Sequence, residues 1–350
     1  MRILRTPAAA AAIVLLAYGC STPVAAPISS TAASLGTTAN ATRTEKPVPS
    51  AAPTSSAAVT LPDAVDIEEA GALAIDATRN TDWVVLVDGQ AWVAGMGDGI
   101  GVLDADGALV QSIEVAGWCE AMDVGFDAVW SASCEPSGVI RVDAATGDVM
   151  RATFDEPIVD SEASVGAGEG AVWVVAGAGS NLLLGVDPTT LEVIHRYAVP
   201  GGAAGVRAGL GGVWVTRPAS NELLRVDPAT GDVIATITVG ETPRFLALGE
   251  GSVWVMNQVD GSVSRIDSAT NAVTATIPTG LPIHGGDIAV GGGAVWVRGG
   301  PELLARIDPV TNGVTARWGP LAGSGSVAAD DEAVWVTAHD IERIWRLPLD

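Results

Sequence analysis

The sequence predicts an all-β fold, a seven-bladed β-propeller of four-stranded antiparallel blades closed by an N-terminal strand that completes the last blade. A Trp among β-branched residues recurs about every 40 residues, a period typical of propellers. An Asp follows each of the first six of these tryptophans at a nearly constant distance, and strand-like runs alternate with Gly-rich turns. The recurring tryptophans are Trp92, Trp130, Trp173, Trp214, Trp254, Trp296 and Trp335.

Residues 245–280 show the repeating unit most clearly. Val, Ile and Thr are frequent in its strand-like runs, and no helical period is present. Each unit is therefore expected to supply the four strands of one antiparallel sheet. The runs lie at 245–248, 252–257, 262–267 and 272–278.

The first and last units are incomplete in complementary ways. Residues 72–77 form a strand-like run ahead of the first Trp hairpin, where every other unit has its fourth strand. After Trp335 the sequence provides one further strand, at 342–347, and no fourth. We expect residues 72–77 to complete the last blade, because a closed ring leaves no unpaired sheet edge between neighbouring blades.

The composition indicates one large domain with an acidic surface. Of the 350 residues, 48% are hydrophobic, and the formal net charge is −23 with a pI near 4.3. This charge argues against a nucleic-acid partner, because a phosphate backbone requires a basic protein face. Since a repeat that closes on itself forms a single unit, we expect one propeller domain at residues 66–350, and we expect a monomer.

Residues 1–19 have the features of an export signal, with Arg2 and Arg5 ahead of an apolar run that is too short to span a bilayer. The segment resembles a bacterial lipoprotein signal peptide, in which cleavage before Cys20 would let that residue carry acyl chains. The resemblance implies a protein anchored by lipid to the cell membrane and facing the extracytoplasmic side. Ala17 stands where the family favours Leu, so cleavage at a nearby site or an uncleaved anchor is the alternative.

Residues 20–65 are rich in Ser, Thr, Ala and Pro. Such a composition buries too little apolar surface to offset the entropy of ordering, so the segment is predicted to be a disordered tether. It would hold the propeller at some distance from the membrane surface.

Cys119 and Cys134 stand symmetrically about the turn Gly125–Ala128 in the second unit. In a hairpin with that turn the two residues face each other across adjacent strands, which favours a disulfide in an exported protein. Zinc is the alternative, but two cysteines without a nearby His make a poor zinc site.

The repeated Trp and Asp residues have structural explanations. A Trp at one fixed phase in every unit is expected to pack between adjacent blades. The repeated Asp, of which Asp227 is an example, is expected to accept hydrogen bonds from the backbone of a tight turn. The spacing of these Asp residues fits no calcium-binding loop.

Polar residues that depart from the repeat gather in loops expected at one face of the ring, where propellers usually carry function. Arg244, His284 and Asp287 lie between units. This set predicts a site for a small anionic ligand, a cell-wall component or an envelope protein, because guanidinium groups bind carboxylates well. Simple pairing of the arginines with nearby carboxylates is the alternative. The remaining members, between the second and third strands of their units, are Arg217, Asn257 and Arg298.

The pattern Gly-x-Gly-Ser/Ala-Val-Trp-Val, followed by Arg-Ile/Val-Asp-Pro-x-Thr-Gly and an outer Ile-x-Val-Gly strand, resembles the repeats of YVTN-type and streptogramin lyase-like (virginiamycin B lyase-like) propellers over residues 72–350. The resemblance implies the propeller fold. For the lyases it also implies Mg²⁺-dependent elimination that opens a cyclic depsipeptide. Those enzymes use histidines before the first strands of late blades and a glutamate three residues past a repeat Trp.

Only part of that catalytic pattern is present. His284 lies near a histidine position of the lyases, but a base without a partner carboxylate or metal ligand is poorly suited to elimination. We therefore expect a tethered binding or scaffolding protein without a cofactor; a lyase that uses His284, Asp287 and Mg²⁺ is the alternative. The residues three past each Trp are all non-acidic: Gly95, Ser133, Ala176, Arg217, Asn257, Gly299 and Ala338.

Overall fold

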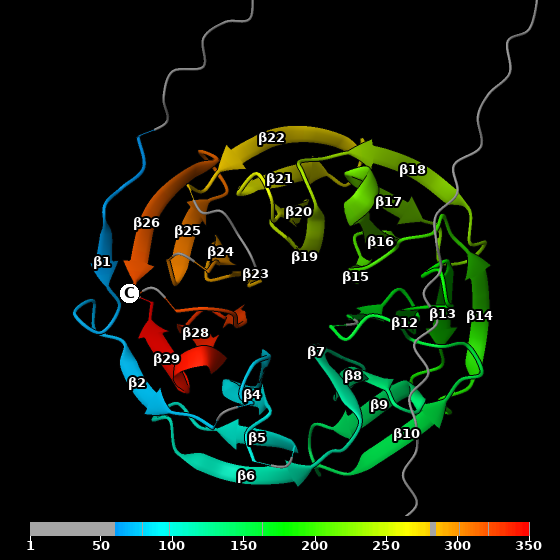
Figure 1. Cartoon of the computed structure of the whole chain (residues 1–350), viewed down its shortest axis with the longest axis horizontal. Coiled ribbons are helices and arrows are strands. Elements are labelled where there is room, and N and C mark those ends of the chain that lie inside the picture. Colours follow the sequence, from blue (N-terminus) through cyan, green and yellow to red (C-terminus); the bar gives the residue numbers. More distant parts are fainter. Residues whose placement is uncertain are drawn as a thin grey trace, which may run out of the picture. The chain divides into compact units, whose positions relative to one another are not determined.

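Seven blades form a closed ring around a central channel in the computed structural model (Figure 1). The structure describes residues 60–78, 80–97, 99–162, 164–280, 285–300, 302–320 and 322–349. The export signal, Cys20, residues 20–59 of the predicted tether and His284 lie outside these ranges. The described elements are strands and two short 3₁₀ helices, which confirms the all-β propeller. Within the same ranges, no helix is long and apolar enough to cross a membrane.

Each blade is an antiparallel meander whose first strand lies nearest the centre of the ring (Figure 1). Blade 1 contains β3 (Val84–Val87), β4 (Gln90–Ala94), β5 (Gly99–Leu103) and β6 (Leu109–Glu114). Blade 2 contains β7 (Trp118–Gly125), β8 (Ala128–Cys134), β9 (Ser137–Asp143) and β10 (Val149–Thr153). Blade 3 contains β11 (Val165–Gly168), β12 (Ala171–Ala176), β13 (Leu182–Val186) and β14 (Val193–Ala198).

The later blades repeat this order. Blade 4 contains β15 (Val206–Gly209), β16 (Gly212–Arg217), η1 (Pro218–Ser220), β17 (Glu222–Val226) and β18 (Val233–Thr238). Blade 5 contains β19 (Pro243–Gly249), β20 (Ser252–Asn257), β21 (Ser262–Asp267) and β22 (Ala272–Pro278), close to the predicted runs. Blade 6 contains β23 (Asp287–Gly291), β24 (Ala294–Arg298), β25 (Leu304–Asp308) and β26 (Gly313–Gly319). Blade 7 contains β27 (Val327–Ala329), β28 (Ala333–Ala338), η2 (His339–Ile341), β29 (Arg343–Pro348) and the N-terminal strand β2 (Leu73–Asp76).

The N-terminal strand closes the ring as predicted. Strand β2 runs antiparallel to β29, with Ile75 opposite Ile344. A further strand that the sequence did not reveal, β1 (Ala64–Asp66), runs parallel to β26 and gives blade 6 a fifth strand. Ile67 follows it, fully buried, and its N–H donates to the Gly319 carbonyl at 3.0 Å. Residues 64–76, here called the N-terminal strap, therefore join blades 6 and 7.

The repeat tryptophans belong to the scaffold, since all seven are at most 2% exposed. In five blades the indole N–H donates to the carbonyl of a Gly five residues earlier, as Trp254 does to Gly249 at 3.1 Å. In five blades an Arg of the third strand also lies over the ring; the closest, Arg265, is 4.8 Å from the Trp254 centroid. Strand register puts each of these Arg residues opposite its Trp, which makes a cation–π contact at the blade edge.

The repeated Asp closes the turn between the third and fourth strands. Asp227 Oδ1 accepts the N–H groups of Ala229 at 2.8 Å and Thr230 at 3.0 Å. Equivalent hydrogen bonds from turn residues lower the pKa of the carboxyl group in four other copies, because they stabilise its charged form. These copies are Asp143, Asp187, Asp267 and Asp308.

The predicted disulfide between Cys119 and Cys134 is present, with Cα atoms 5.5 Å apart. The turn between these strands consists of Phe126 and Asp127, both with positive φ (53° and 56°). Two residues with positive φ form the hairpin turn whose twist matches that of the flanking strands. The Cys134 Sγ lies 3.3 Å from the Asp160 carbonyl oxygen, so the disulfide also contacts the loop that leaves this blade.

Candidate functional site

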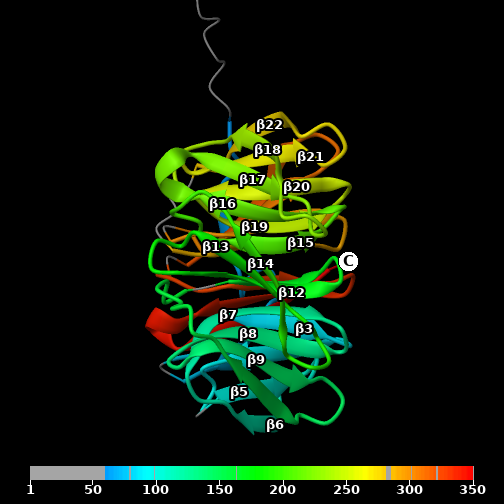
Figure 2. The same ribbon diagram turned by 90° about the vertical axis from the view of Figure 1, so that its right-hand side faces the viewer.

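The ring has two faces, which Figure 2 shows from the side. We call the loop face the one that carries the connections between blades and between second and third strands. The turn face carries the hairpin turns between first and second strands, such as Glu250-Gly251. The residues that the sequence singled out were expected on the loop face.

Arg298 lies at the end of β24 and is fully buried. Its guanidinium donates to the backbone carbonyls of Thr337 at 3.1 Å, Gly323 at 2.7 Å and Ser324 at 3.1 Å, and also to that of Gly299. Burial lowers the pKa of Arg298 to about 10, against the attraction of nearby carboxylates. These bonds join blade 6 to blade 7, and the buried guanidinium is not open to a ligand.

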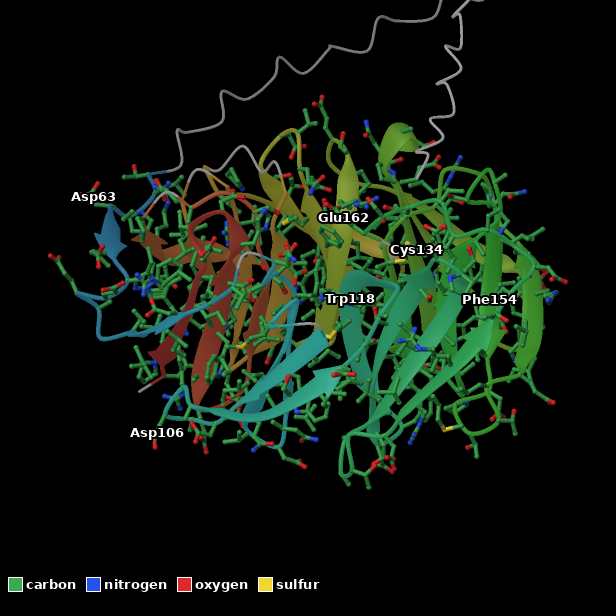
Figure 3. The ribbon with its side chains drawn as sticks, turned by 60° about the horizontal axis from the view of Figure 1, so that its bottom comes forward. Asp63, Asp106, Trp118, Cys134, Phe154 and Glu162 are labelled. Carbon is green, nitrogen blue, oxygen red and sulfur yellow. A yellow bond between two sulfur atoms is a disulfide. The ribbon has the colours of Figure 1, made fainter. Side chains whose placement is uncertain are left out.

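Arg244, at the start of β19, is paired with carboxylates from blade 2. Its two terminal nitrogens each lie 2.7 Å from an oxygen of Asp160, and one lies 3.1 Å from Glu162 Oε2. Both partners belong to residues 154–162, here called the crossing loop, which leaves β10 at Phe154; Phe154 and Glu162 are labelled in Figure 3. Burial alone would lower the pKa of Arg244, but the carboxylates outweigh it and raise that pKa.

Two further predicted residues, Arg217 and Asn257, also have partners within their own blades or beside them. Arg217 pairs with Glu222, and its Nε donates to the Gly201 carbonyl at 3.1 Å. Asn257 is fully buried and donates to the hydroxyls of Ser262 at 2.9 Å and Ser264 at 3.0 Å. Asp287 and Arg298 lie opposite each other on the adjacent strands β23 and β24, but among the described residues no side-chain hydrogen bond or ion pair joins any two members of the predicted set. The described members of the set come from blades 4, 5 and 6.

Two aromatic side chains from opposite sides of the ring close the channel near the loop face. Trp83, just before β3 in blade 1, meets Phe245 of β19 in blade 5 edge to face, with centroids 5.2 Å apart. Each is 4% exposed. Arg244 stacks on the same Phe245 ring, 5.3 Å from its centroid. On the loop-face side of this aromatic plug, a cavity of only about 10 Å³ is left.

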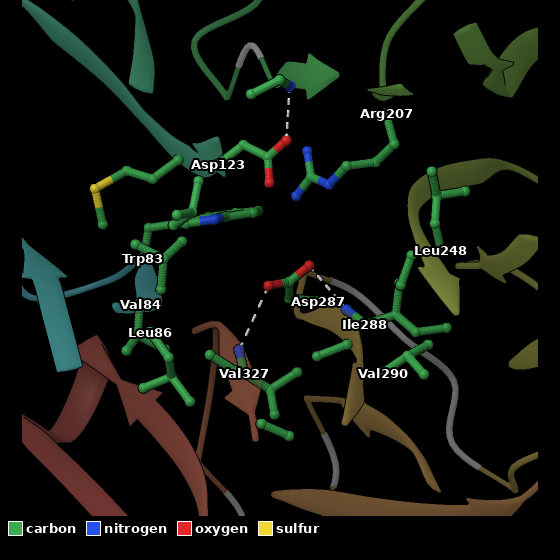
Figure 4. Close-up of a pocket in the computed structure, with 18 of the residues that line it drawn as sticks. Trp83, Val84, Leu86, Asp123, Arg207, Leu248, Asp287, Ile288, Val290 and Val327 are labelled. Atoms are coloured by element: carbon green, nitrogen blue, oxygen red, sulfur yellow. Dashed lines mark hydrogen bonds between the residues drawn. The ribbon is translucent and has the colours of Figure 1, made fainter. Parts of the chain in front are cut away.

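On the other side of the plug, a cavity of about 430 Å³ occupies the channel. The first strands of all seven blades line it. Exposure rises from the plug toward the turn face, from 3% at Ile288 and Val327 to 36% at Val124. The cavity therefore opens at the turn face, and its size is within the range of small-molecule sites. Figure 4 shows its apolar walls and three charged side chains, those of Asp123, Arg207 and Asp287.

Asp123 and Arg207 occupy the same position in their blades, opposite the repeat Trp in the strand register. Side chains converge toward the channel axis here, so small residues are favoured. Two charged residues at this level are therefore departures from the repeat. The other blades carry only apolar residues or Gly there: Val85, Gly166, Ala247, Ala289 and Ala328.

Arg207 is held by backbone, not by a carboxylate. Its Nη1 donates to the carbonyls of Val165 at 2.8 Å and Val206 at 3.1 Å. Gly166 allows the close approach, since a Cβ there would come within 2.9 Å of the Arg207 Cα. Within the described part of the chain, no carboxylate oxygen lies within the 4.0 Å of an ion pair with Arg207. Figure 4 shows the guanidinium pointing into the cavity between Asp123 and Asp287.

Asp287 lies at the plugged end of the cavity and is 3% exposed. One oxygen accepts the Ser326 hydroxyl at 2.7 Å. The same oxygen accepts the Val327 N–H at 3.4 Å, and the other accepts the Ile288 N–H at 2.8 Å (Figure 4). Burial raises the pKa of Asp287 to about 6, although Arg207 and these hydrogen bonds oppose the shift. Its contacts to Ser326 and Val327 also tie blade 6 to blade 7.

Asp123 is held differently. One of its oxygens accepts the Ala167 N–H of the next blade at 2.8 Å, and the residue is only half-buried. Sequence reasoning did not single out Asp123 or Arg207. A signal for both exists: when the units are aligned, each stands seven residues before a repeat Trp, where the other units have an apolar residue or Gly.

In the described ranges, no group of three or more His, Cys, Asp or Glu side chains is arranged to hold a metal ion. His339 lies 2.6 Å from Asp340 and 3.7 Å from Asp82 on the loop face. The predicted Mg²⁺ alternative depends on His284, which the structure does not describe.

Comparison with known proteins shows the fold but not a family. No family model matches the sequence, and no curated protein matches it. Among solved structures, virginiamycin B lyase from Staphylococcus aureus aligns with a TM-score of 0.65 and 17% identity, over 80% of this chain and 99% of the lyase. The Pan2 WD40 domain of Neurospora crassa aligns with a TM-score of 0.60 and 11% identity, over 78% of this chain and 90% of the domain. The β-propeller domain of Cps50 (Swd1) from Myceliophteria thermophila aligns with a TM-score of 0.61 and 13% identity, over 76% of this chain and 95% of that domain.

Proposed function

We propose that this protein is a lipid-anchored, extracytoplasmic binding protein that holds a small polar molecule in the channel cavity open to the turn face. The observation that carries the proposal is Arg207, which points into the channel cavity with no carboxylate of the described residues at ion-pair distance. A guanidinium held by two carbonyls keeps other donors for a ligand. In a cavity of low dielectric such charge-assisted bonds are stronger than in water.

The loop face is the weaker candidate for the binding site. Its two most prominent arginines are engaged, Arg244 by two carboxylates and Arg298 by four carbonyls. A ligand there would have to displace short, charge-assisted bonds, whereas a ligand in the cavity would displace only solvent. The proposed site therefore moves from the loop face, where the sequence pointed, to the opposite mouth of the channel.

A thermal-shift screen of the purified full-length protein tests this function. The compounds comprise small carboxylates, amines, zwitterionic amino acids and neutral sugars at millimolar concentration. We expect at least one class to raise the melting temperature by about 2 °C or more, because a ligand that binds only the folded state stabilises it. The shift should vanish in Arg207→Met and persist in Arg196→Met, which alters an exposed Arg on the outer strand of blade 3. A shift that survives Arg207→Met, or no shift with any class, would contradict the function.

The anchoring part of the proposal rests on the apolar run before Cys20 and on the Ser/Thr/Ala/Pro-rich segment after it. A lipidated Cys20 would hold the cavity outside the cytoplasm. Labelling cells with a palmitate analogue should mark the wild-type protein and not the Cys20→Ser variant. Equal labelling of both would refute lipidation at this position.

A lyase activity is the second candidate, favoured by the pKa of Asp287 near 6, a value suited to acid–base catalysis near neutral pH. Incubation with a cyclic depsipeptide and Mg²⁺, followed by mass spectrometry, tests it. Ring opening that is lost in both His284→Ala and Asp287→Asn would establish the lyase. An intact ring after prolonged incubation would exclude it for that substrate.

A further inference from the structure

The channel cavity contains charged groups of both signs, which restricts the charge of any ligand it can bind. Its described lining contains one guanidinium, Arg207, and two carboxyl groups, Asp123 and Asp287, from three different blades. The remaining lining is apolar or aromatic, with Leu86 and Leu248 among the larger side chains. An anion would be attracted by Arg207 but repelled by both carboxyl groups. A cation would be attracted by the carboxyl groups but repelled by Arg207.

From this arrangement we infer that the ligand is a small zwitterion with a carboxylate for Arg207, an ammonium group for Asp123 and Asp287, and an apolar side chain of modest size. The inference rests on the proposed function and names the ligand class for the same cavity. A zwitterion gives Arg207 and one of the two carboxyl groups a partner of opposite charge, which matters because an unpaired charge in a poorly solvated site is costly.

The hydrogen bonds of the three residues fit these roles. Arg207 uses Nη1 for backbone carbonyls, which fixes the guanidinium and leaves the Nη2 donors for a ligand. Asp123 uses one oxygen for the Ala167 N–H, so the other remains as an acceptor. Asp287 accepts three protein donors and sits deepest, under Trp83. Asp123 is therefore the direct ammonium partner, and Asp287 supplies negative charge at the closed end.

The apolar walls determine what kind of side chain the ligand can carry. Leu86, Leu248 and Val290 come from three blades and line the cavity. A branched aliphatic side chain would bury against them, and each buried methylene would add to affinity. A volume of about 430 Å³ has room for such a molecule with some water.

Three isosteric probes test the ligand class by isothermal titration calorimetry with the full-length protein at pH 7.5. L-leucine carries both charges, 3-methylbutylamine lacks the carboxylate, and 4-methylpentanoate lacks the amine. We expect L-leucine to bind at least tenfold more tightly than either analogue. In Arg207→Met the advantage over the amine should disappear, and in Asp123→Asn the advantage over the acid should disappear. Arg196→Met should change neither ratio.

The outcomes separate this inference from the proposed function. If 4-methylpentanoate or 3-methylbutylamine binds as tightly as L-leucine, and Arg207→Met or Asp123→Asn still weakens it, the zwitterion is wrong and the binding function stands. If none of the three binds, while the thermal-shift screen finds a neutral or singly charged ligand that depends on Arg207, the zwitterion is again wrong. If the screen finds no ligand of any class, the binding function itself fails.

Discussion

Trp83 and Phe245 touch edge to face across the ring, although 162 residues of chain separate them and they belong to blades 1 and 5. This contact turns an open channel into a pocket with one mouth. It also links hydrophobic clusters of blades 1, 2, 5 and 6 into one core. The plug thus has a structural role and a role in shaping the cavity.

A double-mutant cycle measures how much the two aromatic rings of the plug, and the contact between them, contribute to the free energy of unfolding. Trp83→Ala and Phe245→Ala should each reduce the free energy of unfolding by about 3 to 5 kcal/mol, because each leaves a large void among buried side chains. The edge-to-face contact should appear as a coupling energy of about 0.5 to 1.5 kcal/mol in the double variant. Urea denaturation gives all three values. Phe126→Ala, at a residue 39% exposed, is the control and should cost far less. Additive effects would mean that the rings do not interact.

The pKa of Asp287 predicts a pH dependence of stability. The carboxyl group has a pKa of about 6 in the folded protein and 3.8 in the reference state, so the unfolded chain releases this proton first as pH rises. Asp287 therefore reduces stability progressively between about pH 4 and pH 6, by about 3 kcal/mol above that window. The free energy of unfolding of Asp287→Asn, measured relative to wild type, should therefore rise by about 3 kcal/mol between pH 4 and pH 7.5.

Urea denaturation at several pH values checks this prediction. The quantity to compare is the difference in free energy of unfolding between Asp287→Asn and wild type, because the titration of the other carboxylates cancels in it. Asp331→Asn, at an exposed position, is the matched control for loss of one negative charge. A difference that stays constant from pH 4 to pH 7.5 would mean that Asp287 ionises as easily in the folded protein as in the unfolded chain.

Arg298 should be far more important for stability than its repeat position suggests. Arg298→Met leaves four backbone carbonyls without their donor in a fully buried site, and should cost more than about 3 kcal/mol. Arg306→Met is the comparison, since Arg306 bonds Thr315 at an exposed edge, and should cost less than about 1 kcal/mol. Thermal or urea denaturation of both variants distinguishes them. Equal losses would contradict a structural role for the Arg298 guanidinium.

Features repeated in every unit could be predicted from the sequence. The Trp phase, the turn Asp and the complementary first and last units fix the blades and their closure, because each signal recurs or has a partner. The Cys119–Cys134 disulfide was predicted because hairpin register alone brings its two residues together. These inferences need only local spacing and the period of the repeat.

The cavity could not be predicted in the same way, because its residues meet only after the ring closes. Arg207 and Asp287 are 80 positions apart, and neither spacing nor hydrophobic period relates them. The role of Arg298 was hidden for a similar reason: three of its four acceptors are backbone carbonyls in blade 7 or in the connection that leads to it, and every residue type carries such a carbonyl. Polar loop residues suggested a site on the loop face, but tertiary contacts occupy the arginines among them.

The disulfide should stabilise blade 2 and the crossing loop together. Replacing both Cys119 and Cys134 with Ser opens a loop with a sequence separation of 15 residues, which should cost about 3 kcal/mol through the entropy of the unfolded chain. The Asp160 carbonyl contacts Cys134 Sγ, so amide exchange in residues 154–162 should also become faster. Exchange in blade 5 strands beyond Phe245 serves as the internal control. Unchanged stability and exchange would mean that the hairpin is held by its strands alone.

The N-terminal strap should contribute to the stability of the whole ring, because it pairs with the outer strand of blade 6 and supplies the fourth strand of blade 7. Ile67 is fully buried between them, and Glu68 accepts the Trp345 indole N–H at 3.0 Å. Ile67→Ala should therefore cost about 2 to 5 kcal/mol in urea denaturation and lower the unfolding midpoint of the propeller as a single transition. Val65→Ala, two residues earlier and 51% exposed, should cost less than about 0.5 kcal/mol. If both variants unfold like wild type, the segment around Ile67 does not stabilise the ring, and the pairing of β2 with β29 alone completes the last blade.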